Sequence, residues 1–180
     1  MFKKIIVIIV SFFLLTGCHN KISAAMVVDD YLNQYINLSK GVLKSLDETI
    51  NNNEEFKNRH KKLYKKILKK QYKDLKYTIL SEDYADNKAL ITVNINVYDF
   101  NKIDEEATNY LSRNLSEFYN DKNEFDNDLY IDYKLNLMYK AENRIDYTII
   151  FLLEKKKDKW VLIQPTSEDL EKIHGIYKES

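Results

Sequence analysis

Cys18 is the only cysteine in the chain of 180 residues, and its thiol is the side chain whose type and position most clearly suggest chemistry. A thiol can bind a metal, form a disulfide or take a covalent modification. A zinc or disulfide role would require partners, and no second cysteine is present to supply one. Cys18 directly follows Leu15, Thr16 and Gly17. Its role therefore depends on the segment that precedes it.

The segment from Met1 to Gly17 has the layout of an export signal. Lys3 and Lys4 make the N-terminus positively charged, and the inside-negative membrane potential retains this charge on the cytoplasmic side. The segment 5–15 then forms a predominantly apolar run. As a helix this run would span about 16 Å, whereas the hydrocarbon core is about 30 Å thick. The run is too short for a stable transmembrane helix and has the length of a signal-peptide core.

The sequence Leu15-Thr16-Gly17-Cys18 resembles the lipobox of bacterial lipoproteins. That resemblance implies a thioether link between Cys18 and diacylglycerol, followed by cleavage between Gly17 and Cys18. It places the protein on the extracytoplasmic face of the cell membrane, with the membrane as its partner. At least two acyl chains give stable attachment, whereas one binds marginally. An ordinary signal peptide with an incidental Cys18 is the alternative.

Removal of the signal 1–17 leaves the segment 18–180, which is long enough for one domain with its own core. The whole chain has 28 basic and 28 acidic residues, and the signal removes Lys3 and Lys4 but no carboxylate. The remaining net charge of −2 argues against general nucleic-acid binding. Only 3 Gly and 1 Pro leave no room for a Gly-rich phosphate loop or a flexible linker. We expect a lipidated tether over 18–24, of which the part 19–24 reaches at most about 20 Å, and a single domain over 25–180.

Histidines and strand carboxylates are the candidates for acid–base catalysis. His19 lies in the tether, His60 in a lysine-rich run and His174 near the C-terminus. We expect His60 and His174 at the surface or partly buried. We expect Asp132 and Asp146 on the polar faces of strands, solvated or in salt bridges. A general base needs hydrogen-bond reach to its substrate in a sheltered pocket, so we assign no catalytic residue.

An acidic loop before residue 129 has the oxygen-rich composition of a calcium site. Its carboxylates are Asp121, Glu124, Asp126 and Asp128. Calcium loops usually include a glycine at their sharp turn, and this loop has none, whereas Lys122 adds a positive charge. We therefore predict an ordinary solvated loop, and we expect neither a metal site nor a cofactor.

A lysine-rich helix is the strongest pattern beyond the export signal. One interpretation is contact with anionic lipids or wall polymers, at about 1 kcal/mol per lysine near such a surface. The other is a core-packed helix whose solvent-facing lysines are neutralised by the acidic first helix. The lysines considered for surface contact are Lys61, Lys62, Lys65, Lys66 and Lys69.

Two rows of tyrosines and aliphatic residues alternate along predicted strands. Tyr133 and Tyr139 belong to the first row and Tyr147 to the second. Such rows could line a pocket that holds an apolar ligand and orients it through hydroxyl groups. They could equally form a plain core against a helix.

The elements that would position these residues follow from hydrophobic periodicity. Helices are predicted over 25–50 (weakened at Gly41), 54–71 and 102–120, with Asn53 and Asn101 as N-caps, and a short helix after Pro165. Strands are predicted over 72–81, 89–97, 129–139, 145–153 and 160–164. The clearest strand has Ala89, Ile91, Val93, Ile95 and Val97 on one face.

This order predicts an α+β fold, with helices packed on one face of a curved, mostly antiparallel sheet (α-α-β-β-α-β-β-β-α). It resembles the nuclear transport factor 2-like superfamily over residues 25–164, through the segments KALITVNINVYDF and DKWVLIQP. The resemblance implies a cone-shaped domain with an interior pocket. A cystatin-like sheet around one helix is the alternative.

Together these patterns predict a lipid-anchored, non-catalytic domain that binds a small apolar ligand or another envelope protein. The competing hypothesis is a small enzyme, an isomerase or hydrolase, with the interior of the cone as its active site. We do not expect a transport substrate-binding protein, since the segment 18–180 is short for its usual two lobes. Oligomeric state does not follow from the sequence.

Overall fold

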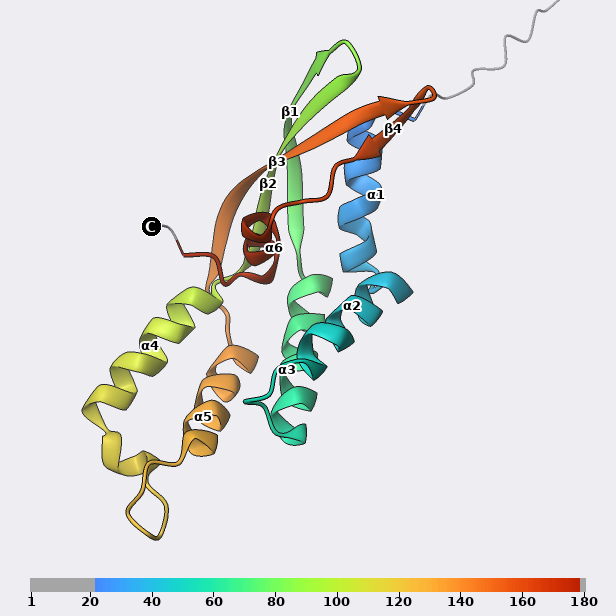
Figure 1. Cartoon of the computed structure of the whole chain (residues 1–180). Helices are drawn as coiled ribbons and strands as arrows, with labels where there is room; N and C mark the ends of the chain where they lie inside the picture. Colours follow the sequence, from blue (N-terminus) through green and yellow to red (C-terminus); the bar gives the residue numbers. More distant parts are fainter. Residues whose placement is uncertain (1–21, 179–180) are drawn as a thin grey trace, which may run out of the picture.

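The computed structural model describes residues 22–178, so Gly17, Cys18 and the export signal lie outside the described part. Figure 1 shows an elongated molecule with the sheet toward one end and a group of helices toward the other. The elements in chain order are α1 (Ala24–Ile36), α2 (Lys40–Asn51), α3 (Asn58–Lys73), β1 (Lys76–Ala85), β2 (Lys88–Tyr98), α4 (Phe100–Arg113), η1 (Leu115–Phe118), α5 (Asn127–Tyr139), β3 (Arg144–Lys156), β4 (Lys159–Leu162) and α6 (Ser167–His174).

The four strands form one antiparallel sheet in the order β1-β2-β3-β4. The alternation predicted for β2 is confirmed, because its five inward apolar residues are buried. Tyr147, Ile149 and Phe151 extend this buried face onto β3. Helices α1 and α6 pack on it. The opposite face is open, with Leu90 and Ile150 exposed. The prediction of an α+β fold with helices on one face of an antiparallel sheet is therefore confirmed.

The strand predicted over 129–139 is wrong, because these residues form helix α5. Its buried positions are Ile131, Leu135 and Met138, which recur at the three- and four-residue spacing of a helix. The Asp126 side chain accepts a hydrogen bond from the N–H of Asp128 at the helix start. The sheet consequently has two strands after α4 instead of three. The cone implied by the nuclear transport factor 2-like resemblance is not confirmed.

Helix boundaries also differ from the prediction. The helix expected over 25–50 is two helices, and the break lies at Leu38 (φ +49°) rather than at Gly41. The Ser39 side chain accepts a hydrogen bond from Val42 and caps α2. The Asn53 side chain accepts hydrogen bonds from residues 55 and 56, so it shapes a turn, and α3 begins only at residue 58. The helix expected over 102–120 is α4 followed by the short helix η1.

The end of α6 joins three other elements. Gln71 on α3 is fully buried and donates hydrogen bonds to the carbonyls of Tyr98 and His174, both at 3.0 Å. The carbonyl of Gly175 accepts hydrogen bonds from the first amides of α4, at Phe100 and residue 101. These amides lack partners within their own helix. The last helix therefore fixes α3 and α4 against the sheet.

Candidate functional site

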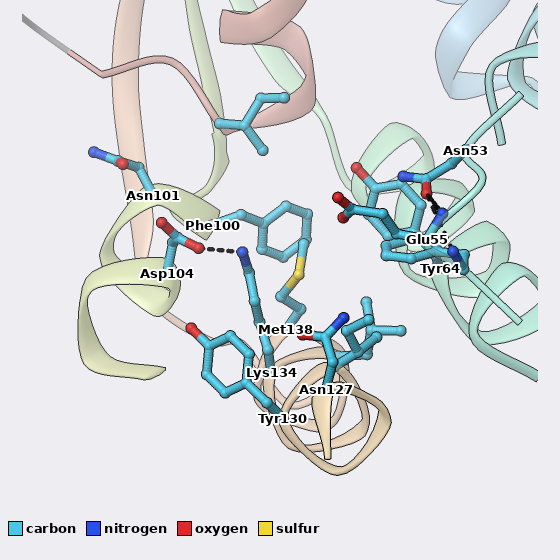
Figure 2. A pocket seen from close by; sticks show the side chains of 14 residues that line it. Asn53, Glu55, Tyr64, Phe100, Asn101, Asp104, Asn127, Tyr130, Lys134 and Met138 are labelled. Carbon is cyan, nitrogen blue, oxygen red and sulfur yellow. Dashed lines mark hydrogen bonds and ion pairs between the residues drawn. The ribbon is translucent and has the colours of Figure 1, made fainter. Parts of the chain in front are cut away.

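An open cleft of about 420 Å³ lies among α3, α4, α5 and the loop before α3. Figure 2 shows its walls coming from separate parts of the chain. The loop and α3 contribute Glu55 and Tyr64, whereas α4 and α5 contribute Asp104 and Lys134. Its volume falls within the range of small-molecule sites, about 300–1,000 Å³.

The floor of the cleft is apolar. It consists of side chains from α4 and α5, together with Phe56 from the loop and Ile176 from the segment after α6. The residues from α4 and α5 are Phe100, Ile131, Leu135 and Met138. These four are largely buried, while Ile176 is 39 % exposed. Burial of the apolar surface of a ligand against this floor would contribute about 25 cal/mol of favourable free energy for each Å² removed from water.

Polar side chains surround this apolar floor. Lys134 on α5 forms an ion pair with Asp104 on α4, and Figure 2 shows the pair along one wall. Tyr130, one turn before Lys134, has its hydroxyl 3.4 Å from that of Thr108. Burial raises the pKa of Tyr64 above its usual value, so its hydroxyl stays protonated. The arrangement can orient a ligand that has an apolar body and polar ends.

Sequence reasoning missed this cleft. Its polar residues Glu55, Asp104, Tyr130 and Lys134 come from the loop before α3, from α4 and from α5, which are far apart in the sequence. A helical interpretation of residues 127–139 would have placed Tyr130 and Lys134 one turn apart on α5. That interpretation was available from the spacing of Ile131, residue 135 and residue 138.

The expected surface position of His60 is wrong, because its side chain is fully buried between α3 and α5. Its Nδ1 accepts a hydrogen bond from the Lys57 amide at 3.3 Å. Its Nε2 lies 3.1 Å from Asp132 but is too misaligned to form a hydrogen bond. Asp132 instead accepts hydrogen bonds from Arg59. His60 does not line the cleft, so this histidine–carboxylate contact joins two helices outside it.

The five lysines considered for surface contact have divided roles. Lys61 donates a hydrogen bond to the carbonyl of Asn51, and Lys65 forms an ion pair with Asp47, both on α2. The side chains of Lys62 and Lys66 are exposed. Lys69 is partly buried, and no contact of its side chain decides between the two interpretations. Part of the positive charge of α3 is therefore balanced within the domain.

The three tyrosines proposed as pocket lining do not come together. Tyr133 lies on α5 and stacks on Tyr110 of α4, with ring centroids 4.7 Å apart. Tyr139 is exposed at the end of the same helix. Tyr147 is buried under the sheet and donates a hydrogen bond to the carbonyl of Tyr177. None of the three lines the cleft. Tyr133 and Tyr139 do not form a row on a strand, because the segment that contains them is a helix.

The acidic loop uses its side chains for local structure. Asn120 accepts hydrogen bonds from the amides of Lys122 and Glu124. Asp128 forms an ion pair with Lys57. Among residues 22–178, no group of three or more His, Cys, Asp and Glu side chains is arranged to hold a metal ion.

The remaining candidates lie apart from the cleft. Asp146 is exposed on the open face of the sheet, where it accepts hydrogen bonds from Asn94 and Asn96. His174 packs beside Tyr72, and burial lowers its pKa to about 4. His19 lies outside the described residues.

Comparison with known proteins assigns no family to this chain. No family model matches it, and no curated protein matches it. One solved structure, from Bacillus subtilis subsp. subtilis str. 168, is described as "a putative lipoprotein (ycdA)" and has a TM-score of 0.40 and 13 % identity. The alignment covers 86 % of this chain and 47 % of that one, so this chain spans about half of that protein. A likeness at this level is too weak to assign a fold or a function.

None of the helices within residues 22–178 is both long and apolar enough to cross a bilayer.

Proposed function

We propose that this chain is an extracytoplasmic lipoprotein whose domain binds a ligand in the cleft among α3, α4 and α5. After removal of residues 1–17, acyl chains on Cys18 attach the protein to the cell membrane. The ligand is a small molecule, or the end of a segment from an envelope protein, with an apolar body and at least one polar or charged end. The observation that supports binding is the apolar floor beside the Asp104–Lys134 ion pair.

The enzyme alternative has less support. A His–carboxylate pair in contact with the cleft would favour catalysis. His60 and Asp132 are in contact, but His60 has no exposed surface. We therefore propose binding without chemistry and expect the cleft to release its ligand unchanged.

The cleft can be tested by filling it from its rim. In the mature chain, Asn127→Trp adds a large side chain at an exposed position that borders the cleft. Asn136→Trp adds the same side chain on α5 at an exposed position outside the lining. The probe is 1-anilinonaphthalene-8-sulfonate, which has an apolar body and a charged end, and its fluorescence is titrated against each protein.

We expect Asn127→Trp to weaken probe binding at least about tenfold, equivalent to about 1.4 kcal/mol. Asn136→Trp should leave it unchanged. Equal effects of the two variants, or none, would contradict a binding cleft at this place. Circular dichroism of both variants shows whether the helices are intact.

The lipid anchor has its own test. Cys18→Ala removes the thiol that would receive diacylglycerol, so we expect the protein to move from the membrane fraction to the soluble fraction in a lipoprotein-processing bacterium. Metabolic labelling with an alkyne fatty acid should mark the wild type and not the variant. Persistent membrane association of the variant would contradict the proposed anchor and leave the cleft proposal untouched.

A further inference from the structure

Large apolar side chains are exposed at the end of the domain where the described chain begins. Ile22 is 58 % exposed, Met26 is 52 % exposed and Tyr84 is 50 % exposed. Trp160, the only tryptophan of the chain, is partly exposed beside Tyr84. Scattered exposed apolar residues are ordinary, so their position relative to one another decides whether they matter.

Contacts place these residues at one end. The rings of Tyr84 and Trp160 lie with centroids 5.6 Å apart, which joins the β1–β2 hairpin to β4. The Tyr84 hydroxyl lies beside the backbone amides of Ala24 and Ala25 at the start of α1. Figure 1 shows the start of α1, β4 and the β1–β2 hairpin toward the same end of the molecule. The exposed apolar residues therefore surround the point where the tether joins the fold.

Lysines accompany the apolar residues. Near their turns, the β1–β2 and β3–β4 hairpins contain Lys88, Lys155, Lys156, Lys157 and Lys159. Five carboxylates lie on the same hairpins, at Glu82, Asp83, Asp86, Glu154 and Asp158, so the charges balance, and Glu82 accepts a hydrogen bond from the Tyr84 hydroxyl. The Lys155 ammonium lies 5.8 Å from the centre of the Trp160 ring. Tryptophan, tyrosine and lysine together are typical of protein surfaces at the level of lipid headgroups.

We propose that this end, defined by Ile22, Met26, Tyr84 and Trp160 and called the tether end below, docks onto the lipid bilayer. The proposal rests on the lipid anchor at Cys18. Ile22 is the fourth residue after Cys18, which allows a reach of at most about 14 Å. The lipid is therefore delivered to the tether end and to no other part of the domain. Each apolar side chain that enters the interface adds to the attachment by the acyl chains.

Docking at the tether end fixes which way the domain faces. Helix α1 has 13 residues, and a helix of that length extends about 20 Å. Figure 1 shows that α3, α4 and α5 lie toward the far end of the molecule from the start of α1. The cleft then faces away from the membrane, toward the envelope. The lysines of α3 are likewise held away from the lipid surface.

The single tryptophan and the single cysteine make this orientation measurable. Mature chain is coupled through the Cys18 thiol to a maleimide phospholipid in vesicles of phosphatidylcholine and phosphatidylglycerol. Brominated phospholipid, which quenches tryptophan only at short range, is then included in the bilayer. We expect Trp160 emission to fall at least about twofold and to shift to shorter wavelength, as befits an interfacial tryptophan.

A second reporter tests the opposite face. The double variant Trp160→Phe/Lys62→Trp has its only tryptophan at an exposed position of α3. Its emission should be unaffected by the brominated lipid. Stronger quenching from α3 than from Trp160 would overturn the proposal and make the lysine helix the bilayer surface. Absence of quenching at Trp160 would overturn it as well.

A matched pair of variants separates docking from mere proximity. Ile22→Asn/Met26→Asn removes apolar contact at the tether end, and we expect it to reverse most of the quenching. Leu115→Asn/Leu129→Asn makes the same change at exposed apolar residues of η1 and α5 and should leave the quenching as in wild type. Equal quenching in all three proteins would mean that the tether alone holds Trp160 near the lipid, which contradicts docking. Because the coupling is chemical, these results do not depend on lipidation in cells, which Cys18→Ala tests separately.

Discussion

The side chain of Gln71 pairs with the backbone of Tyr98 as a neighbouring strand would. Its Oε1 accepts a hydrogen bond from the Tyr98 amide at 2.8 Å, and its Nε2 donates one to the Tyr98 carbonyl at 3.0 Å. The same Nε2 donates to the carbonyl of His174. A single buried amide thus holds the end of β2, the end of α6 and α3 together.

Gln71→Leu keeps most of the side-chain volume and removes all three hydrogen bonds. The amide and carbonyl of Tyr98 would stay buried without partners, at about 1–3 kcal/mol for each such group. We expect the free energy of unfolding, measured by urea titration, to fall by about 3 kcal/mol. Gln34→Leu, at an exposed position of α1, is the matched control and should change it by less than about 0.5 kcal/mol. Equal effects would show that the Gln71 amide has no special role.

The two glycines of the described residues, Gly41 and Gly175, should respond in opposite directions to alanine. Gly175 has φ +73°, and a Cβ there would lie 2.1 Å from the Tyr98 carbonyl oxygen. At Gly41 a Cβ would meet only the Ser39 hydroxyl, at 3.9 Å. We expect Gly175→Ala to lower the melting temperature strongly, at a cost of about 2 kcal/mol or more. Gly41→Ala should raise stability by about 0.5 kcal/mol, because alanine favours the helix.

Acid should destabilise the fold through His174. Burial lowers its pKa from 6.5 to about 4, so the folded protein resists a proton that the unfolded chain accepts. Stability from this group is complete above pH 6.5 and is lost as the pH falls toward 4, at about 1.4 kcal/mol per pH unit. His174→Phe should flatten this part of the curve of unfolding free energy against pH. An unchanged slope in the variant would assign the acid sensitivity to other groups.

The lysines of α3 should divide into a structural pair and a neutral pair. Lys61→Glu/Lys65→Glu breaks the contacts with Asn51 and Asp47 on α2 and should lower the unfolding free energy by about 1 kcal/mol.

Lys62→Glu/Lys66→Glu makes the same charge change at exposed positions and should leave stability within about 0.5 kcal/mol. Sedimentation of a Cys18-less domain with anionic vesicles should also be the same for this second pair as for wild type. If this variant sedimented less with the vesicles than wild type, α3 would be the membrane-facing surface.

The sheet was predictable where one periodicity dominates. Every second residue of β2 from Ala89 to Val97 is apolar and buried, and the inward positions of β3 show the same pattern. Residues 127–139 fit two periods at once, because apolar residues at every second position include Ile131 and Leu135, which also lie one helical turn apart. Met138, which breaks the alternation, and Asp126, which caps the helix, favour α5.

The prediction of a strand instead of a helix over residues 129–139 also hid the candidate site. On a strand, Asp128 and Asp132 would both point to the solvent face, whereas on α5 they lie one turn apart and face α3. There they contact the segment around Arg59 and His60, which closes one side of the helix group behind the cleft. The ion pair between Asp104 and Lys134 forms only when α4 packs against α5. No local pattern in the sequence predicts such a long-range pair.

The position of α6 has a consequence for the order in which the fold can close. The carbonyl of Gly175 caps the start of α4, and that of His174 completes the bonding of Gln71. These groups belong to the end of the last described element, which follows in the chain every helix and strand that it secures. The nascent domain would wait, with α3 and α4 unsecured, until almost its whole length has been delivered. Closure of the fold would then come as a single late step, when α6 reaches α3 and α4.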